Sequence, residues 1–352
     1  MKKADDSVIH QKPPWSLWPT TRRAWIRLAC LIGTTAGGIA FAGWYTMSMP
    51  KSSYRGELPP LDEEALRVEK ALRDDVHVLA MEIGERNLAH VDLLRRAEAF
   101  LVESFGEAGY RPELQELRVG EKLARNIEVE IVGGEHASEI VVIGAHYDSA
   151  HGPAANDNAS GTAALLELAR WASSQRFART VRFVAFVNEE PPYFQVPGQM
   201  GSEVYAARCR SRQEDIVAML SLETLGYYDD RPGSQRYPWP FSWFYPSRGD
   251  FVAFVGDLGS RSLVRRAIGA FRADTAFPSE GIALPGSIAG VDWSDHWSFW
   301  QHGFEAIMVT DTAIFRYPYY HRLQDTPDKI DFEGLARVVV GLRDVITTLA
   351  SR

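Results

Sequence analysis

The segment from residue 144 to 161, GAHYDSAHGPAANDNASG, concentrates side chains that can bind metal ions or move protons. It places His146, Asp148 and Asp157 close together on a backbone made mostly of small residues. A surface loop has no need of this histidine, and a core strand does not tolerate unpaired carboxylates, because burying an unpaired charge is costly. The composition of this segment therefore indicates a functional site.

Other candidate residues follow apolar runs elsewhere in the chain. Glu189 and Glu190 follow the run TVRFVAFVN, Glu223 ends the run IVAMLSLE, and His321 lies in YPYYHRLQDTPD. In open α/β sheets, ligands collect just beyond the carboxyl ends of the strands. We therefore expect these side chains to meet those of the 144–161 segment, which brings two histidines and five carboxylates together.

Imidazole and carboxylate ligands suit zinc or a similar first-row metal, and the lack of a thiolate argues against a closed structural site. One carboxylate bridging two ions, with one histidine and one further carboxylate on each, makes a dinuclear hydrolytic site with ions about 3.5–4 Å apart. Residues i and i+2 of an extended chain point the same way. Asp148 can therefore accept the second N–H of His146 and fix its tautomer.

The motifs occur in the order His-x-Asp, Asp-Asn-x-x-Gly, Glu-Glu, a later acidic residue, and a histidine before DTPD. This order resembles the M28 family of zinc metallopeptidases, which contains aminopeptidases, glutaminyl cyclases and glutamate carboxypeptidases. The resemblance covers roughly residues 85 to 350. It implies two zinc ions, one held by His146 and Glu223 and the other by Glu190 and His321, with Asp157 bridging them.

The resemblance also implies that Glu189 is the general base, that Asp148 orients His146, and that the Asp157–Asn158 peptide is cis. Glu223 departs from the family pattern, in which many members have aspartate. The segment SDHWSF, residues 294–299, also resembles a family segment near the active site. It implies a supporting role for Asp295 or His296.

The resemblance implies an exopeptidase that removes the N-terminal residue of a peptide. A metal lowers the pKa of its water towards about 7, and Glu189 takes a proton and returns it to the leaving amine. Three alternatives stay open: a glutaminyl cyclase with one zinc, a carboxypeptidase, and an inactive zinc-binding scaffold domain. A carboxypeptidase needs a basic pocket, for which Arg231, Arg236 and Arg248 are available.

The remaining sequence predicts the scaffold. Residues 61–110 carry apolar residues at helical spacing. Beyond them, β-type runs alternate with helical segments such as SGTAALLELARWASS and LARVVVGLRDVITTLA. This alternation predicts an α/β fold with a mostly parallel mixed sheet and helices on both faces. We expect residues 61–352 to form the M28-like domain.

The N-terminal region predicts export. No charged residue occurs from Leu28 to Met49, and about 20 apolar residues cross a membrane as a helix. Basic residues precede this segment, so residues 1–27 are expected in the cytoplasm. Residues 28–49 then form an anchor in the inner (plasma) membrane, residues 50–60 a linker, and the catalytic domain lies outside. Alternatively TRRAWIR, residues 21–27, is a twin-arginine signal, cleaved near AFA to release a secreted protein.

Composition narrows the partners. After residue 55 the chain has 30 Lys/Arg against 44 Asp/Glu, which argues against nucleic acid and leaves a peptide as the expected substrate. Cys30 and Cys209 are the only cysteines in the 352 residues, and no internal disulfide is expected. The aromatic stretch from 227 to 251 predicts either a loop packed on the domain or a wall of an apolar substrate pocket, which residues 191–202 also line.

Overall fold

The computed structural model describes residue 19 and residues 21–351, which divide into two units at Met47 and Ser48. In the first unit, helix α1 (Arg22–Met47) is long and apolar enough to cross a membrane, and a signal sequence near the N-terminus has the same properties. Lys2, Lys3 and Lys12, which belong to the basic residues that precede the apolar segment, lie outside the described residues.

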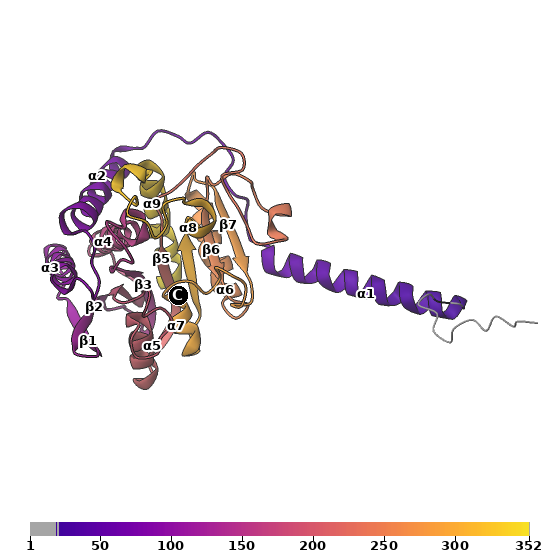
Figure 1. Cartoon of the computed structure of the whole chain (residues 1–352), viewed down its shortest axis with the longest axis horizontal. Helices are drawn as coiled ribbons and strands as arrows, with labels where there is room; N and C mark the ends of the chain where they lie inside the picture. Colours follow the sequence, from indigo (N-terminus) through magenta and orange to yellow (C-terminus); the bar gives the residue numbers. More distant parts are fainter. Residues whose placement is uncertain (1–18, 20, 352) are drawn as a thin grey trace, which may run out of the picture. The chain divides into compact units, whose positions relative to one another are not determined.

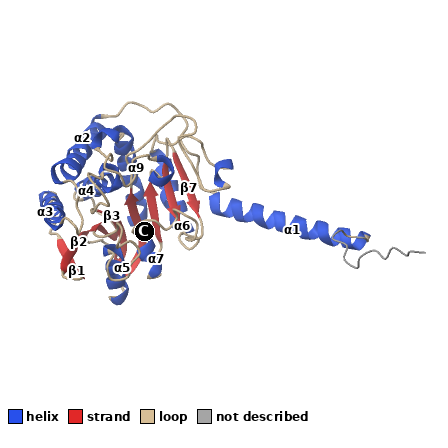
Figure 2. Ribbon diagram, viewed as in Figure 1, coloured by secondary structure: helices blue, strands red, loops and turns tan. Residues whose placement is uncertain are grey.

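The second unit contains an eight-stranded sheet in the order β1-β2-β4-β3-β5-β8-β6-β7 (Figures 1 and 2). The strands are β1 (Glu113–Val119), β2 (Lys122–Ile131), β3 (His136–His146), β4 (Arg179–Phe186), β5 (Asp215–Glu223), β6 (Val252–Gly256), β7 (Ser279–Ala283) and β8 (Ala306–Thr310). Strands β4, β3, β5 and β8 are parallel to one another, as are β6 and β7. The pairs β1–β2, β2–β4 and β8–β6 are antiparallel. The predicted mixed, mostly parallel sheet is confirmed.

The helices of this unit are α2 (Glu63–His77), α3 (Val91–Glu107), α4 (Gly161–Ala172), α5 (Gly201–Ser211), α6 (Arg261–Asp274), α7 (His296–Gln301), α8 (Ala313–Arg316) and α9 (Phe332–Ala350). Helices α4 to α7 lie in connections between strands, whereas α2 and α3 precede the first strand and α8 and α9 follow the last. Short π or 3-10 turns are η1 (Val78–Ile83), η2 (Ala155–Ser160), η3 (Phe241–Trp243) and η4 (Pro327–Lys329).

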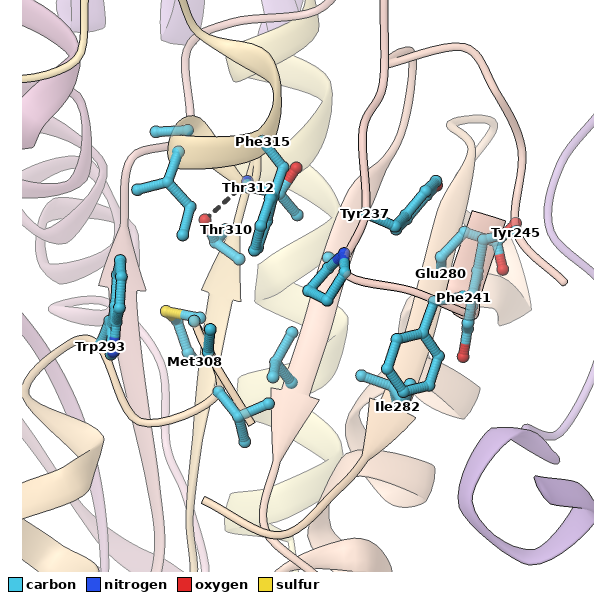
Figure 3. A pocket seen from close by; sticks show the side chains of 18 of the residues that line it. Tyr237, Phe241, Tyr245, Glu280, Ile282, Trp293, Met308, Thr310, Thr312 and Phe315 are labelled. Carbon is cyan, nitrogen blue, oxygen red and sulfur yellow. Dashed lines mark hydrogen bonds between the residues drawn. The ribbon is translucent and has the colours of Figure 1, made fainter. Parts of the chain in front are cut away.

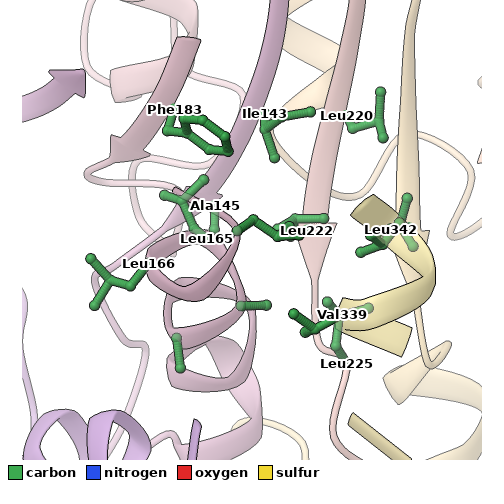
Figure 4. Packing of buried hydrophobic residues seen from close by; sticks show 14 of the residues in the cluster. Ile143, Ala145, Leu165, Leu166, Phe183, Leu220, Leu222, Leu225, Val339 and Leu342 are labelled. Atoms are coloured by element: carbon green, nitrogen blue, oxygen red, sulfur yellow. The ribbon is translucent and has the colours of Figure 1, made fainter. Parts of the chain in front are cut away.

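Both faces of the central strands are buried, as β3 illustrates. Successive residues of a strand point to opposite faces. Val141 and Ile143 belong to the largest apolar cluster, which includes residues of α4 and α9 (Figure 4). Their neighbours Ile140 and Val142 belong to a second cluster with residues of α5 and α7. This two-sided burial explains why β3 has a continuous apolar sequence rather than an alternating one.

Several elements were not expected from the sequence, and three of them illustrate the reason. Strand β1, ELQELRV, carries charged residues because it is an edge strand whose residues are mostly exposed or half-buried. Strand β7, SEGIA, is five residues long and lies at the opposite edge of the sheet. Helix α7 has only six residues. Short or edge elements bury little apolar surface, so their sequences carry a weak periodic signal.

Candidate metal centre

The parallel strands bring their carboxyl ends, and the residues that follow them, to one place. His146 is the last residue of β3, and Glu223 is the last residue of β5. Glu189 and Glu190 follow the end of β4 at Phe186 by three and four residues. Since β4, β3 and β5 are neighbours in the sheet, these side chains lie above adjacent strand ends, as predicted.

A first group of possible ligands surrounds the ring of His146. Its Nε2 atom lies 3.2 Å from Oε2 of Glu223 and 3.5 Å from Oδ1 of Asp157. Asp157 reaches this position from the turn η2, immediately before α4. All three residues are buried, so their charges are poorly screened by water.

A second group forms around His321, which lies in the loop after α8. Its Nε2 atom lies 3.1 Å from Oδ2 of Asp157 and 3.1 Å from Oε2 of Glu190. The two oxygens of Asp157 therefore face two different histidines. This is the arrangement expected of a carboxylate that bridges two cations.

The residues present fit zinc. His146 Nε2, Asp157 Oδ2 and Glu190 Oε1 are buried atoms without a hydrogen-bond partner among the described residues. Such groups are normally satisfied, and a cation in each group would satisfy them. Within each group the possible ligand atoms lie within 4.8 Å of one another. Nitrogen and carboxylate oxygen ligands suit zinc.

The electrostatics of this cluster favour added positive charge. Burial, with Asp157 next, raises the pKa of Glu190 to about 7. Burial opposes the charge on His321, but its close contacts with the carboxylates of Asp157 and Glu190 outweigh burial and raise the pKa of His321 to about 10. The pKa of Asp157 is lowered, since burial is outweighed by its contacts with His146 and His321. Without a metal, protons on the histidines compensate the carboxylates.

Comparison with known sequences and structures identifies the family. Residues 126–346 match the sequence profile of Peptidase family M28. The chain belongs to family M28. Its match to the uncharacterized protein YfbL of Escherichia coli K12 is 39% identical over 288 residues, which cover 79% of this chain and 86% of YfbL.

Solved structures of similar fold include zinc aminopeptidases and glutaminyl cyclases. BSAP, a zinc aminopeptidase from Bacillus subtilis, matches with a TM-score of 0.63 at 14% identity. The match covers 84% of this chain and 97% of the BSAP chain. A glutaminyl cyclase from Fimbriiglobus ruber has a TM-score of 0.60 at 20% identity and covers 84% of this chain and 98% of its own. At these identities the likeness shows a shared fold.

Glu189, the general base implied by the M28 resemblance, lies beside the first group. Its Oε2 is 3.8 Å from Nε2 of His146, and its side chain is buried. Burial raises the pKa of Glu189 well above its usual value; His146 opposes this shift, and Glu223 adds to it. A cation nearby favours the ionised form of a carboxylic acid, so a bound metal would oppose this shift.

Asp148 contacts both His146 and the backbone of the neighbouring strand end. Its Oδ1 lies 3.5 Å from Nδ1 of His146, and its two oxygens accept the backbone N–H groups of Glu189 and Glu190 at 3.2 Å each. One buried carboxylate thereby fixes the positions of both glutamates relative to His146. The contact of Asp148 with His146 was expected from the sequence, whereas its hydrogen bonds with the backbone of Glu189 and Glu190 were not.

The SDHWSF segment lies beside the candidate metal centre, and the supporting role expected of Asp295 or His296 stays a prediction. Asp295 is fully buried, and neither oxygen has a hydrogen-bond partner among the described residues; burial raises its pKa to about 7. The ring of His296 makes a 2.7 Å hydrogen bond with the carbonyl of Val291 and packs against Trp300. The residue that contacts a predicted ligand is Ser294, whose hydroxyl donates to Oε2 of Glu223 at 2.7 Å.

Asp325, in the DTPD motif, holds the backbone beside the bridging aspartate. Its two oxygens accept the N–H groups of Asn156 at 2.8 Å and Asp157 at 3.0 Å. The side chain of Asn158 donates to the carbonyl of Leu222, near the end of β5, at 2.8 Å. The Asp157–Asn158 peptide is cis, as the family resemblance implied. The motif residues around Asp157 therefore tie it to two other segments.

Arg86 supports the same region, although nothing in the sequence distinguished it. This arginine is fully buried. It donates to the carbonyls of Tyr147 and Pro153 at 2.8 Å each and of Ala154 at 3.1 Å. These carbonyls belong to the loop that joins His146 to Asp157. The buried side chain of Arg86 thus holds the conformation of that loop through these hydrogen bonds.

An apolar pocket adjoins the first group. Glu223 and Tyr320 are among its lining residues, and it encloses about 870 Å³ including its open mouth. Figure 3 shows Trp293 and Met308 on one side and Tyr237, Phe241 and Ile282 on the other. Residues of the aromatic stretch 227–251 therefore form one wall of an apolar pocket. This agrees with the second of the two predictions for the stretch, a pocket wall. No residue of 191–202 is among those that line this pocket.

Proposed function

We propose that this M28 protein is a zinc-dependent aminopeptidase that uses two zinc ions and Glu189 as general base. The observation that carries the proposal is the geometry of Asp157. Its two oxygens face two separate histidine–glutamate pairs, with 3.1 Å to His321 and 3.5 Å to His146. A scaffold domain that had lost its activity would have no need to keep both pairs and Glu189 together.

The zinc ions would supply Lewis-acid chemistry, acidifying a water molecule and polarising the scissile carbonyl. Glu189 accepts the proton of the attacking water and delivers it to the nitrogen of the leaving amine. Asp148 holds Glu189 in place through the backbone N–H group of that residue. The burial of Glu189 keeps bulk water away from this proton, so the transfer stays within the site.

The apolar pocket is the proposed site for the side chain of the N-terminal residue. It begins at Glu223, and its lining is dominated by aromatic and aliphatic residues such as Phe241, Ile282 and Met308. Burial of apolar surface stabilises a bound side chain by roughly 25 cal/mol per Å². We expect large apolar or aromatic N-terminal residues to be preferred.

The direct test compares wild type with the Glu189→Gln variant, by metal analysis and by digestion of a peptide library. We expect the variant to keep its metal and to lose about 10²- to 10⁴-fold in turnover, the usual contribution of a general acid–base. Equal turnover in the two proteins would remove Glu189 from this role.

A glutaminyl cyclase is the second candidate, favoured by the fold likeness to the Fimbriiglobus ruber enzyme. Two measurements distinguish the candidates. An aminopeptidase of the proposed kind binds two zinc ions per chain and releases free glutamine from a peptide with N-terminal Gln. A cyclase of the expected kind binds one zinc and yields a pyroglutamyl product with no change in peptide length.

For the N-terminal unit, we propose that α1 remains as a membrane anchor with its N-terminus in the cytoplasm. Its 26 residues span about 39 Å at 1.5 Å per residue, more than the roughly 30 Å of a hydrocarbon core. The intact mass of the membrane-bound protein tests this proposal. A mass that lacks the first 42 or so residues would instead indicate cleavage of a signal.

A further inference from the structure

A short loop of the second unit exposes large aromatic side chains. This segment, Pro238–Tyr245 (PWPFSWFY), is called the aromatic loop below. Trp239 is 78% exposed, Trp243 71% and Phe244 60%. The rings of Trp239 and Trp243 lie 5.8 Å apart, so they form one patch. Contiguous exposed apolar groups of this size mark a contact with a partner or a membrane.

The loop is anchored to the rest of the second unit by a hydrogen bond and by ring contacts. The hydroxyl of Tyr245 donates to the carbonyl of Gly281 in β7 at 2.9 Å. The ring of Tyr237, just before the loop, lies 5.8 Å from that of Tyr245 in a stacked arrangement. Phe241 and Tyr245 line the apolar pocket (Figure 3). The loop thus has an inner side that forms the pocket and an outer side that faces solvent.

The first residues of the second unit are attached to the same strand. A Cβ atom on Gly281 would lie 3.0 Å from Cγ of Met49, so Met49 packs directly on β7. The hydroxyl of Ser53 accepts the backbone N–H of Ser279 at 2.9 Å. Arg272 of α6 donates to the carbonyls of Pro50 and Lys51 at 3.3 and 3.1 Å. The chain therefore contacts the β7 edge from residue 49 onward, with no free linker before it.

This attachment limits where a membrane can lie. Helix α1, the candidate span, ends at Met47, and Met49 is already packed on β7. Only Ser48 separates the end of α1 from Met49, which packs on Gly281. If α1 crosses a bilayer, Gly281 therefore lies close to the bilayer surface. The aromatic loop is bonded to that same glycine. Tryptophan and tyrosine are enriched at membrane interfaces because their rings are amphipathic.

The charges near this edge agree with a lipid surface. Lys51 and Arg55 lie near β7, Arg236 and Arg248 flank the aromatic loop in sequence, and all four are exposed. Basic residues near a membrane are attracted to anionic headgroups. Among the nearby acids, Glu57 is exposed, Asp250 is half-buried, and Glu280 is half-buried with Arg272 at 3.8 Å. The β7 edge therefore combines exposed aromatic rings with basic side chains, although the second unit as a whole is acidic.

We propose that the aromatic loop is a membrane contact, with Trp239, Trp243 and Phe244 lying in the interfacial region of the bilayer that α1 enters. The second unit then rests on the membrane by its β7 edge. The pocket wall formed by the same loop lies next to the lipid surface. This surface is independent of the proposed peptidase activity, because none of the three side chains lines the pocket or the metal centre.

The test uses the full chain in nanodiscs of phosphatidylcholine and phosphatidylglycerol. An environment-sensitive fluorophore is attached at Trp243→Cys or, as a matched control, at Val132→Cys, both in a Cys30→Ser background. Burial raises the pKa of Cys209 to about 12, so this cysteine stays unreactive. Val132 is 70% exposed and follows β2, six strands from β7, or about 29 Å at the usual strand spacing.

We expect spin-labelled lipid to quench the fluorophore at position 243 at least about threefold more strongly than at position 132, with a blue-shifted emission at 243 only. The Phe244→Cys variant provides a second site in the loop and should behave like Trp243→Cys. Equal, weak quenching at 243, 244 and 132 would overturn the proposal. The double variant Trp239→Ser, Trp243→Ser should cleave a soluble peptide at the wild-type rate, which separates this result from a failure of the proposed function.

Discussion

The two halves of the candidate metal centre share Asp157 but differ in how they are built. His146 and Glu223 are the last residues of two parallel strands and are buried. His321 lies in a loop, its side chain is 31% exposed, and its backbone has a φ of 55°. A non-glycine residue at positive φ costs of order 1–3 kcal/mol unless the surrounding structure holds it. One half thus belongs to the sheet, and the other depends on a loop.

The largest effect is expected where the two halves meet. The Asp157→Asn variant removes a negative charge that both groups share, so we expect loss of both zinc ions and a fall in turnover of at least about 10³-fold. Elemental analysis of the purified variant and hydrolysis of a peptide measure the two effects. The Asp328→Asn variant, at an exposed position, is the matched control. Two zinc ions per chain in the Asp157 variant would show that this residue is no bridge.

The next prediction separates the halves. In the His321→Ala variant we expect one zinc per chain and a loss of about 10²-fold in activity, while the fold is kept because the loop side chain is partly exposed. In the His146→Ala variant we expect the melting temperature to fall as well, since the change opens a cavity among buried carboxylates. Zinc content and thermal unfolding measure both variants. Identical zinc content and melting temperature in the two variants would show that the sheet half and the loop half do not differ.

A smaller effect is expected from Ser294, which supports the sheet half only. The Ser294→Ala variant loses the 2.7 Å hydrogen bond to Glu223. The loss of a supporting hydrogen bond of this kind typically lowers metal affinity by about 10-fold or more. Competition with a zinc chelator measures this change. The control is Ser298→Ala, because Ser298 bonds to Ser202 rather than to a predicted ligand; equal affinity in wild type and Ser294→Ala would contradict the account.

The smallest predicted effect is the pH dependence of the metal-free protein. Folding raises the pKa of His321 to about 10, so its stabilising contribution is complete below its unfolded value of 6.5 and is lost as the pH rises towards 10. Glu190, whose pKa is raised from 4.5 to about 7, also loses its contribution as the pH rises through 7. Asp157, with a lowered pKa, loses its contribution only below its unfolded value of 3.8.

From pH 6 to 8 we therefore expect the melting temperature of the metal-free protein to fall by about 2–4 °C. The gain on adding zinc should grow over the same range, because zinc competes with these protons. The fall should be smaller in the His321→Ala variant. A melting temperature that stays constant or rises with pH in the chelated wild type would contradict the predicted charge balance.

The same contrast explains what the sequence could predict. The strand-end residues His146 and Glu223 were predictable because a buried parallel strand has a continuous apolar sequence, and a polar residue marks its end. Asp157 and His321 were assigned from their motifs. Arg86, Ser294 and Asp325 were not assigned roles, because each acts through backbone or carboxylate groups of segments distant in sequence. Such partners become visible only when the chain is folded.

The aromatic stretch shows the same limit in a surface segment. Its composition predicted either a packed loop or a pocket wall. The folded chain places Tyr237 and Phe241 in the wall and leaves Trp239 and Trp243 exposed. Because neighbouring aromatic residues face opposite directions here, composition alone could not separate the two sides.

If Asp157 joins two cation sites, anomalous X-ray diffraction at the zinc edge will locate both ions beside it. Crystals of the zinc-loaded protein should show two anomalous peaks about 3.5–4 Å apart. One peak should lie beside His146 and Glu223, the other beside His321 and Glu190, with an oxygen of Asp157 on each. A single peak, or two peaks of which only one contacts Asp157, would contradict the account.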